Sequence, residues 1–345
     1  MRSDLPKMRT PPLVLVLGLA ACASDFGTEC VCDQPIASYA NSPSACAAHC
    51  RRDGAPDAIV RAPLAPAPSG APRARIPLRL HQMWKSELVP ASYAPYVRSW
   101  LRLHPSWEYV FWSDGDIAWL FERHGLGALH ARLRSIQRAD AARYVALGVW
   151  GGVYADLDME ALRPLDPLLG AGATLLLGQE PRAHARLLNN MERLTCNAIL
   201  GAAPRHPFWP HVLRALEAAT RRASDPVSST GPRMLEQAVR AYGPDAERAI
   251  APPETFYPCF GPIATQKART MCARGAPPAA GEWQRKACDE LRASNFSNAP
   301  SPDSYTDHHW THSWLGQVDT RSTFNVSALL LASARHHERA GPRAV

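Results

Sequence analysis

The chain has 345 residues, of which 46% are hydrophobic and 20% are charged, so it is long enough for one large core plus an appendage or for two domains. Its formal net charge of +7 comes from scattered basic residues without a Lys/Arg block. The absence of a zinc-finger or RNA-recognition pattern argues against sequence-specific nucleic-acid binding. A diffuse positive field suits an anionic small-molecule substrate instead.

The N-terminus has the composition of an export signal. Arg2, Lys7 and Arg9 precede the apolar run PPLVLVLGLAACA, which ends in small residues. This run is shorter than the ~20 residues of a membrane-spanning helix, so we expect cleavage, with an uncleaved signal-anchor as the alternative. Residues 19–22, LAAC, also fit a bacterial lipoprotein cleavage box, so an exported bacterial lipoprotein is a further alternative.

Eight cysteines follow the leader, and an even number in an exported chain favours disulfides over metal-binding or catalytic thiols. We expect pairing within two groups, 30–50 and 196–288, and zinc binding by the first group is the alternative. The cysteines are Cys30, Cys32, Cys46, Cys50, Cys196, Cys259, Cys272 and Cys288. Glycosylation sequons at Asn295 and Asn325 agree with a lumenal location.

Composition divides the chain into five segments. We expect a signal peptide or signal-anchor over 1–28, a small Cys-rich module over 29–60, a Pro/Ala-rich linker over 61–75, a globular domain over 76–330 and a flexible tail over 331–345. The linker sequence, RAPLAPAPSGAPRAR, should be extended and semi-rigid.

Strands and helices alternate from Ile76 onward. A strand in IPLRLHQMW and an amphipathic helix in ASYAPYVRSWLRLHP come first. A second strand, EYVFW, and a helix, SDGDIAWLFERHG, capped by Ser113 or Asp114, follow. The next helix should begin near Ile136 and end at Gly151-Gly152, before a short strand, VYA.

The second half continues the alternation for about 70 residues. ATLLLGQE predicts a strand, and HPFWPHVLRALEAATRR and RMLEQAVRAYG predict helices. From Ala251 onward the sequence is rich in Pro, Cys and Asn, which favours short strands and loops. The rhythm as a whole indicates an α/β fold with a mainly parallel sheet and flanking helices.

Asp156 and Asp158 follow the short strand directly. Two carboxylates at a strand end can share a divalent cation through their oxygens. The common alternative is a turn or N-cap role. An EF-hand is excluded, because Ala161 and Pro167 stand where that loop needs Gly and Glu.

Two other clusters accompany the acidic pair. Asp140 and Arg143 share a helix face, either as a surface salt bridge or as a fork that binds sugar hydroxyls. The stretch HHWTHSW, residues 308–314, is either an aromatic core strand with satisfied histidines or part of a site. His308 and His312 could form a helical zinc pair, but the glutamate of the HExxH pattern is missing.

Five ordered blocks make the sequence resemble glycosyltransferase family 32 over roughly residues 75–315. They are IPLRLHQMWK, HPSWEYVFWSD, RADAARYVALGVWGGVYADLDMEALRPLD, STGPRML and HHWTHSW. The family comprises DXD-containing sugar transferases related to initiation α-1,6-mannosyltransferase and inositol-phosphoceramide mannosyltransferases. The resemblance implies a GT-A fold, a Rossmann-like sheet, with a Mn²⁺ or Mg²⁺ cofactor and retention of configuration.

Residue by residue, the resemblance implies roles for matching positions. Asp156 and Asp158 match the aspartates that hold the metal on the donor diphosphate. Asp140 and Arg143 match donor-sugar contacts, so these four form the expected catalytic set. His308, with its neighbour His309 as the alternative, matches a histidine near the metal and phosphates.

The remaining matches concern substrate binding. His81, Gln82 and Trp112 fall where the family holds the nucleoside, and Ser313 and Trp314 match the closing segment. Two departures, Gly148 where the family has an aromatic residue and His312 where a small residue is usual, bear on the acceptor side.

The function implied is transfer of a hexose, with mannose from GDP-mannose favoured, to a hydroxyl of a glycan or glycolipid in the Golgi lumen. UDP-galactose or UDP-N-acetylglucosamine is the alternative donor. A metal-dependent hydrolase and an inactive secreted carbohydrate-binding protein are rival classes. The sequence offers no evident covalent nucleophile, so we expect front-face attack with the leaving phosphate as base.

Overall fold

The computed structural model describes residues 75–333 except 171, 246, 276–279, 314, 315, 317 and 331. It also describes four short N-terminal strands: β1 (Cys22–Ala23), β2 (Glu29–Cys32), β3 (Cys50–Arg52) and β4 (Ile59–Arg61). Most of the leader, the Cys-rich module, the linker and the tail lie outside the described residues, as does Trp314. The pairing of the first four cysteines and the domain boundaries therefore stay predictions.

A central sheet has the strand order β12-β10-β11-β8-β5-β7-β4. Its strands beyond β4 are β5 (Arg79–Met83), β7 (Glu108–Trp112), β8 (Gly152–Ala155), β10 (Leu175–Gln179), β11 (Thr195–Ala202) and β12 (Arg248–Ala251). β5 pairs in parallel with β7 and β8, and β10 with β12. β11 lies antiparallel between β8 and β10, and β4 pairs antiparallel with β7. The predicted α/β sheet is confirmed, with β4, β11 and β12 as strands that we did not predict.

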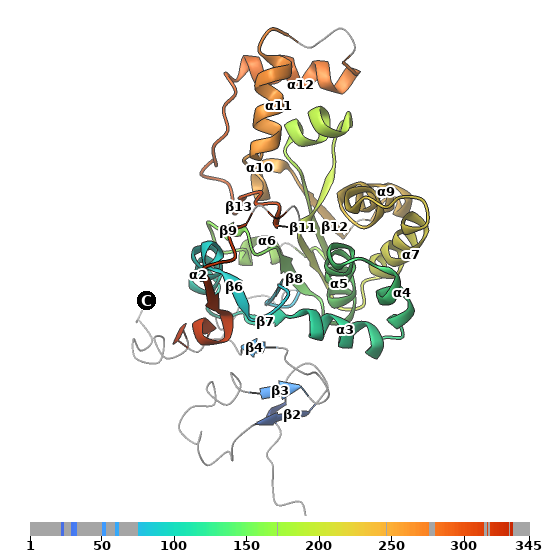
Figure 1. Ribbon diagram of the computed structural model, residues 1–345, viewed down its shortest axis with the longest axis vertical. Helices are drawn as coiled ribbons and strands as arrows, with labels where there is room; N and C mark the ends of the chain where they lie inside the picture. Colours follow the sequence, from blue (N-terminus) through green and yellow to red (C-terminus); the bar gives the residue numbers. More distant parts are fainter. Residues whose placement is uncertain are drawn as a thin grey trace, which may run out of the picture.

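Helices cover both faces of the sheet (Figure 1). On one face lie α3 (Asp114–Arg123), α4 (Gly127–Arg132), α5 (Ser135–Trp150), α7 (Phe208–Thr220) and α9 (Pro232–Tyr242). Their buried side chains, such as Phe121 and Trp209, form one large core. On the other face α2 (Ala94–Leu103) buries Val97 and Trp100 in a second core. The helices expected in these segments are all present.

Local signals explain where these helices begin and end. Ser113 caps α3 by a capping box, accepting a hydrogen bond from the backbone N–H of Asp116, whose carboxylate accepts in return. Gly151 ends α5 with φ 63°, and a side chain there would lie 2.6 Å from the backbone nitrogen of Pro204. The Gly-Gly break therefore turns the chain directly from α5 into β8.

The prediction of strands and loops after Ala251 is wrong over most of this segment. It contains α10 (Pro253–Phe256), α11 (Pro262–Cys272) and α12 (Glu282–Ala293). Proline misled the prediction, because it stands at the first turn of α10 and α11, where its missing N–H costs nothing. Two short strands do follow: β13 (Thr306–His308) and β14 (Thr323–Asn325).

The helices α11 and α12 form a lobe above the sheet together with the π-helix η3 (His184–Leu188) (Figure 1). A disulfide, Cys272–Cys288, joins the two helices inside its small apolar core. Cys196 and Cys259 are free thiols, which corrects the expectation that all four cysteines of this group form disulfides. Cys196 is buried in β11, where it packs as a small apolar side chain.

The strand order creates a switch point at β5. From β5 the chain moves through α2 to β7 on one side, and then returns through α3 to α5 to β8 on the other side. In open α/β sheets, ligands bind in the crevice at the carboxyl ends of strands where this reversal occurs. Asp156 and Asp158 lie at that end of β8.

Two small strand pairings and three short helices complete the described structure around the central sheet. β9 (Met159–Ala161) pairs antiparallel with β13, which brings His308 opposite Met159. β6 (Leu88–Pro90) pairs with β14. The short helices α6 (Asp166–Leu169), α8 (Pro226–Ser229) and the 3₁₀ helix η2 (Ala91–Tyr93) fill the connections. Both sequon asparagines, Asn295 and Asn325, are exposed.

Within the described residues, no helix has the length and apolar character needed to cross a membrane.

A buried histidine makes the fold sensitive to acid. His104 accepts the backbone N–H of Leu165 on Nε2 at 2.9 Å, so Nδ1 carries the proton and donates to the carbonyl of Trp100. Burial lowers the pKa of His104 to about 4, against a weaker opposing effect of the Trp100 carbonyl.

We predict that the free energy of unfolding decreases as the pH is lowered from about 6.5 to 4. The unfolded chain binds a proton at His104 in this range and the folded chain does not, so stability is present above pH 6.5 and is lost towards pH 4. The contribution is about 3 kcal/mol. Denaturant unfolding of the wild type and His104→Gln measures it, and the variant should have a shallower dependence on pH. Equal slopes would contradict the assignment.

Candidate functional site

A cavity of about 990 Å³ lies at the carboxyl ends of β5, β7 and β8. Its walls come from these strand ends, from α5, from the α8–α9 connection, from the lobe and from the C-terminal segment. The predicted site residues that line it are Asp140, Arg143, Asp156, Asp158, His308 and Ser313. Residues that are up to 173 positions apart in the chain are thus brought to one cavity.

Asp158 is held by the C-terminal segment. Its Oδ1 accepts a hydrogen bond from Nε2 of His308 at 3.1 Å, and its Oδ2 accepts from the backbone N–H and the hydroxyl of Thr311 at 2.9 and 2.8 Å. Burial alone would raise the pKa of Asp158, but His308 and Thr311 outweigh it and hold the pKa below its usual range. The carboxylate is therefore ionised.

The loop that carries Thr311 has a strained backbone. Trp310 and His312 both adopt positive φ, at 51° and 47°, on either side of Thr311. Side chains rarely accept this conformation, and such strain is stored where the surrounding structure requires it. Here the bend lets one residue direct both its backbone N–H and its hydroxyl to Asp158.

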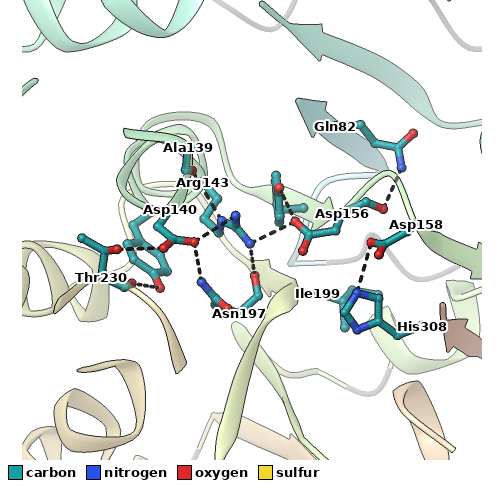
Figure 2. Close-up of polar contacts among 12 residues, drawn as sticks. Gln82, Ala139, Asp140, Arg143, Asp156, Asp158, Asn197, Ile199, Thr230 and His308 are labelled. Carbon is teal, nitrogen blue, oxygen red and sulfur yellow. Dashed lines mark hydrogen bonds and ion pairs between the residues drawn. The ribbon is translucent and has the colours of Figure 1, made fainter. Parts of the chain in front are cut away.

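Asp156, Asp158 and His308 could together hold a divalent cation. One potential ligand atom from each lies within 4.8 Å of those of the other two. The ring nitrogen of His308 on the side of the aspartates is Nε2, which lies 3.1 Å from Oδ1 of Asp158 (Figure 2). Two carboxylates and one imidazole suit Mn²⁺ or Mg²⁺ when phosphate oxygens supply further ligands. The residues present therefore fit the expected cofactor.

A buried guanidinium connects Asp156 to the neighbouring helix α5 (Figure 2). Arg143 is 3.0 Å from Oδ1 of Asp156 through Nη1 and 3.0 Å from Oδ1 of Asp140 through Nη2. Nη1 also donates to the carbonyl of Asn197 at 2.7 Å. The guanidinium lies over the ring of Tyr154 at 4.5 Å, and the Tyr154 hydroxyl donates to Asp156. Asp140 and Arg143 are thus a buried pair and not a surface salt bridge.

Asp140 also accepts two hydrogen bonds from residues outside its own helix. Asn197 donates to its Oδ1 at 2.8 Å and the Thr230 hydroxyl donates to its Oδ2 at 2.7 Å (Figure 2). Burial raises the pKa of Asp140, with Arg143 and Thr230 opposing that shift. The rigid arrangement leaves Asp140 and Arg143 lining the cavity with defined orientation.

Three predicted nucleoside residues lie behind the cavity wall. His81, Gln82 and Trp112 are each 0% exposed, and none lines the cavity. Trp112 donates to Nδ1 of His81, while the Gln82 amide donates to the carbonyl of Asp156 at 3.2 Å. Their contacts are those of positioning residues. Their nucleoside role stays a prediction.

The other end of the C-terminal segment is partly described. Ser313 lines the cavity, as does His312. Trp314 lies outside the described residues. His309 contacts Glu160 at 3.0 Å and stacks on Tyr96. His309 is absent from the cavity lining, so of His308 and His309 it is His308 that lies in the cavity, beside Asp158.

Sequence reasoning missed four residues that hold the site together. They are Asn197, Thr230, Thr311 and Glu180, of which Asn197 and Glu180 line the cavity. Thr230 and Thr311 lie inside blocks that carried the resemblance, so a search for hydroxyl donors there could have found them. Asn197 and Glu180 lie in or beside strands, without a local pattern that marks them.

The geometry agrees with comparisons to known proteins. Residues 90–174 match the family model described as the glycosyltransferase sugar-binding region containing a DXD motif. Inositol phosphoceramide mannosyltransferase 1 of Schizosaccharomyces pombe is 32% identical over 154 residues, covering 43% of this chain and 45% of that protein. Mannosyl phosphorylinositol ceramide synthase SUR1 of Saccharomyces cerevisiae is 32% identical over 202 residues, covering 56% and 49%. The chain spans about half the length of these curated relatives.

A crystal structure of an active-site mutant of LgtC is also similar, with a TM-score of 0.37 and 12% identity over 75% of this chain and 95% of that chain. The fold class of this chain is set by its own strand order and flanking helices. The resemblance to glycosyltransferase family 32 is confirmed by the family model and the curated relatives.

We predict that Arg143→Ala lowers the free energy of unfolding by about 3–5 kcal/mol, because it leaves Asp140 and Asp156 without their buried counter-charge. The matched control is Arg182→Ala, which removes a guanidinium from an exposed pair with Glu254 and should cost less than about 1 kcal/mol. Urea unfolding measures both. Similar losses in the two variants would show that the Arg143 network does not stabilise the fold.

Proposed function

We propose that this chain, a protein of the glycosyltransferase family 32 type, is a retaining, metal-dependent transferase that moves a hexose from a nucleotide-sugar to a hydroxyl of a glycan or glycolipid. The observation that carries the proposal is the cluster of Asp156, Asp158 and His308 at the switch point, beside the buried Asp140–Arg143 pair. A carboxylate cluster next to a fixed sugar-binding fork is what transfer from a nucleotide-sugar requires.

The cofactor would be held by Asp156, Asp158 and His308. A divalent cation supplies positive charge where the leaving diphosphate becomes more negative, which stabilises the transition state more than the ground state. Mn²⁺ is the favoured ion because one ligand is an imidazole, and Mg²⁺ is the alternative.

The residues of the chain bind and orient the donor. Asp140 can accept from a sugar hydroxyl, and Arg143 holds Asp140 and Asp156 at fixed positions on either side of itself. Gln82, Tyr154 and Thr311 fix the two aspartates by hydrogen bonds, and of these three only Tyr154 lines the cavity. The cost of ordering these side chains is met during folding, so little remains to be ordered when the donor binds.

Retention is proposed to occur by front-face attack. The acceptor hydroxyl would approach from the side of the leaving phosphate, which takes its proton. Glu180 also lines the cavity, but its carboxylate is directed to Nδ1 of His184 at 3.5 Å, which supports a structural role rather than a nucleophilic one.

Mannose from GDP-mannose is the favoured donor, since two of the curated relatives are named as a mannosyltransferase and a mannosyl phosphorylinositol ceramide synthase. UDP-galactose and UDP-N-acetylglucosamine are the alternatives. The leader, the cysteines and the sequons support a location in the secretory pathway, in the Golgi lumen, either tethered at the N-terminus or cleaved and soluble.

We predict that Asp158→Asn lowers metal-dependent transfer at least about 100-fold, because the amide removes one negative metal ligand while keeping the shape of the side chain. Transfer is measured with GDP- and UDP-sugars, Mn²⁺ and hydroxyl acceptors, and thermal unfolding without metal checks the fold. Asp303→Asn, at an exposed carboxylate outside the cavity, is the matched control and should keep full activity.

The same assay separates the rival classes. Donor cleavage that does not depend on an acceptor would favour a hydrolase. Glycan binding without any Mn²⁺-dependent binding of a nucleoside diphosphate would favour a carbohydrate-binding protein. Full transfer by Asp158→Asn in the presence of EDTA would refute the metal role.

A further inference from the structure

The cavity extends from Asp156, Asp158 and His308 to the ends of β5 and β7. Lys85 and Asp114 line it there. Lys85 follows β5, and Asp114 begins α3 directly after β7. The backbone N–H of Asp114 points to the carbonyl of Lys85 at 3.4 Å, so the two residues are neighbours. Because β8, β5 and β7 are consecutive strands, Asp114 lies about 10 Å along the sheet edge from the strand that ends at the aspartate pair.

Apolar and charged side chains both line the end of the cavity near Lys85 and Asp114. Met83, Ile117 and Ile136 line the cavity from β5, α3 and α5, and they provide an apolar slot. Asp114 is exposed, and among the described residues none donates a hydrogen bond to its carboxylate. An apolar slot with one open carboxylate suits a flat ligand that carries N–H groups on its edge.

The distance from the two aspartates to Asp114 is comparable to the distance between the diphosphate and the base of a nucleotide. A donor whose diphosphate lies at Asp156, Asp158 and His308 would place its base about two strand spacings (~10 Å) away. This is the end of the cavity that Asp114 lines. The buried residues His81 and Trp112 do not belong to the cavity lining at this end. Asp114 and Lys85 are the charged side chains that remain from these two strand ends.

Purine and pyrimidine bases differ in what they offer to a carboxylate. Guanine presents two adjacent donors, N1–H and the N2 amino group, which match the two acceptor oxygens of a carboxylate. Uracil presents one N–H between two carbonyl oxygens, and adenine places a lone pair beside its amino group. A carboxylate facing either of these would meet an acceptor.

We propose that Asp114 is the residue that reads the nucleobase of the donor and selects guanine, by accepting N1–H and N2–H with its two oxygens. This inference rests on the proposed function, because it assigns a base to the nucleotide of the same site. Lys85, beside Asp114, is placed to donate to the guanine carbonyl oxygen. This role would explain the acidic residue directly after β7 independently of its effect on helix α3.

The competing explanation is that Asp114 stabilises α3 as an acidic residue in its first turn. The helix already has a capping box from Ser113 and Asp116, so its N-terminus is satisfied without Asp114. Arg138, Lys85 and His130 face the carboxylate and favour its charged form, while partial burial raises its pKa. Among the described residues, none of these basic groups donates a hydrogen bond to the carboxylate.

Binding of three nucleoside diphosphates tests the proposal. The dissociation constants of GDP, IDP and UDP are measured by titration calorimetry with Mn²⁺ for the wild type, Asp114→Ala and Asp114→Asn. IDP differs from GDP by the N2 amino group alone, so the GDP-to-IDP ratio isolates one of the two proposed hydrogen bonds. A hydrogen bond to a charged acceptor corresponds to a ratio of about 10 or more.

We expect the wild type to bind GDP at least about 10-fold more tightly than IDP or UDP. In Asp114→Ala the GDP-to-IDP ratio should fall to about 1, while UDP binding is unchanged or improved. Asp114→Asn should shift the preference towards UDP, because an amide offers one donor and one acceptor. Asp289→Ala, at an exposed carboxylate on α12 outside the cavity, is the control and should keep the wild-type ratios.

The outcomes separate this inference from the proposed function. Mn²⁺-dependent binding of UDP in preference to GDP, or a GDP-to-IDP ratio that Asp114→Ala leaves unchanged, would overturn the role of Asp114 while leaving the transferase proposal intact. If no nucleoside diphosphate binds with Mn²⁺, both proposals fail. Thermal unfolding of each variant confirms that a changed ratio does not reflect a changed fold.

Discussion

The site depends on one buried cation, the guanidinium of Arg143. It lies between Asp140 on its own helix and Asp156 after β8, and it also binds the carbonyl of Asn197 on β11. Without it, two carboxylates would share a poorly solvated space, and like charges there would raise the pKa of one of them or push the strand end away. The same contact therefore stabilises the packing of α5 on the sheet and sets the spacing of the cavity wall.

The C-terminal segment completes the site by adding a strand. Pairing of β13 with β9 places His308 beside Asp158, and the strained turn that follows brings Thr311 to the same carboxylate. The aspartates of the motif are thereby supported from two directions, by α5 through Arg143 and by the C-terminal segment through Asp158. Such double support fixes the orientation of both aspartates, which are the carboxylates that could hold a divalent cation.

The prediction from sequence succeeded where a signal is local. A few neighbouring residues are enough to identify the Gly-Gly break after α5, the N-cap of α3 and the strand β7. It failed after Ala251, where prolines that begin helices were taken as signs of loops, and at β11, where complete burial removes the alternation that marks a strand. The free thiols of Cys196 and Cys259 show that an even cysteine count predicts pairing poorly when packing holds one of them in a sheet.

The sequence by itself determined the candidate residues, because Asp-x-Asp after a strand and Asp and Arg three positions apart on a helix are local patterns, and they lie in a block that resembles glycosyltransferase family 32. The tertiary structure alone decided which of them face the cavity and what holds them. Asn197, Thr230 and Thr311 reach the aspartates across 57, 90 and 153 positions of chain, and no periodicity in the sequence encodes contacts at such separations. It also decided that His81, Gln82 and Trp112 are buried behind the wall, since the direction of a side chain at a strand end depends on what the neighbouring strands and helices cover.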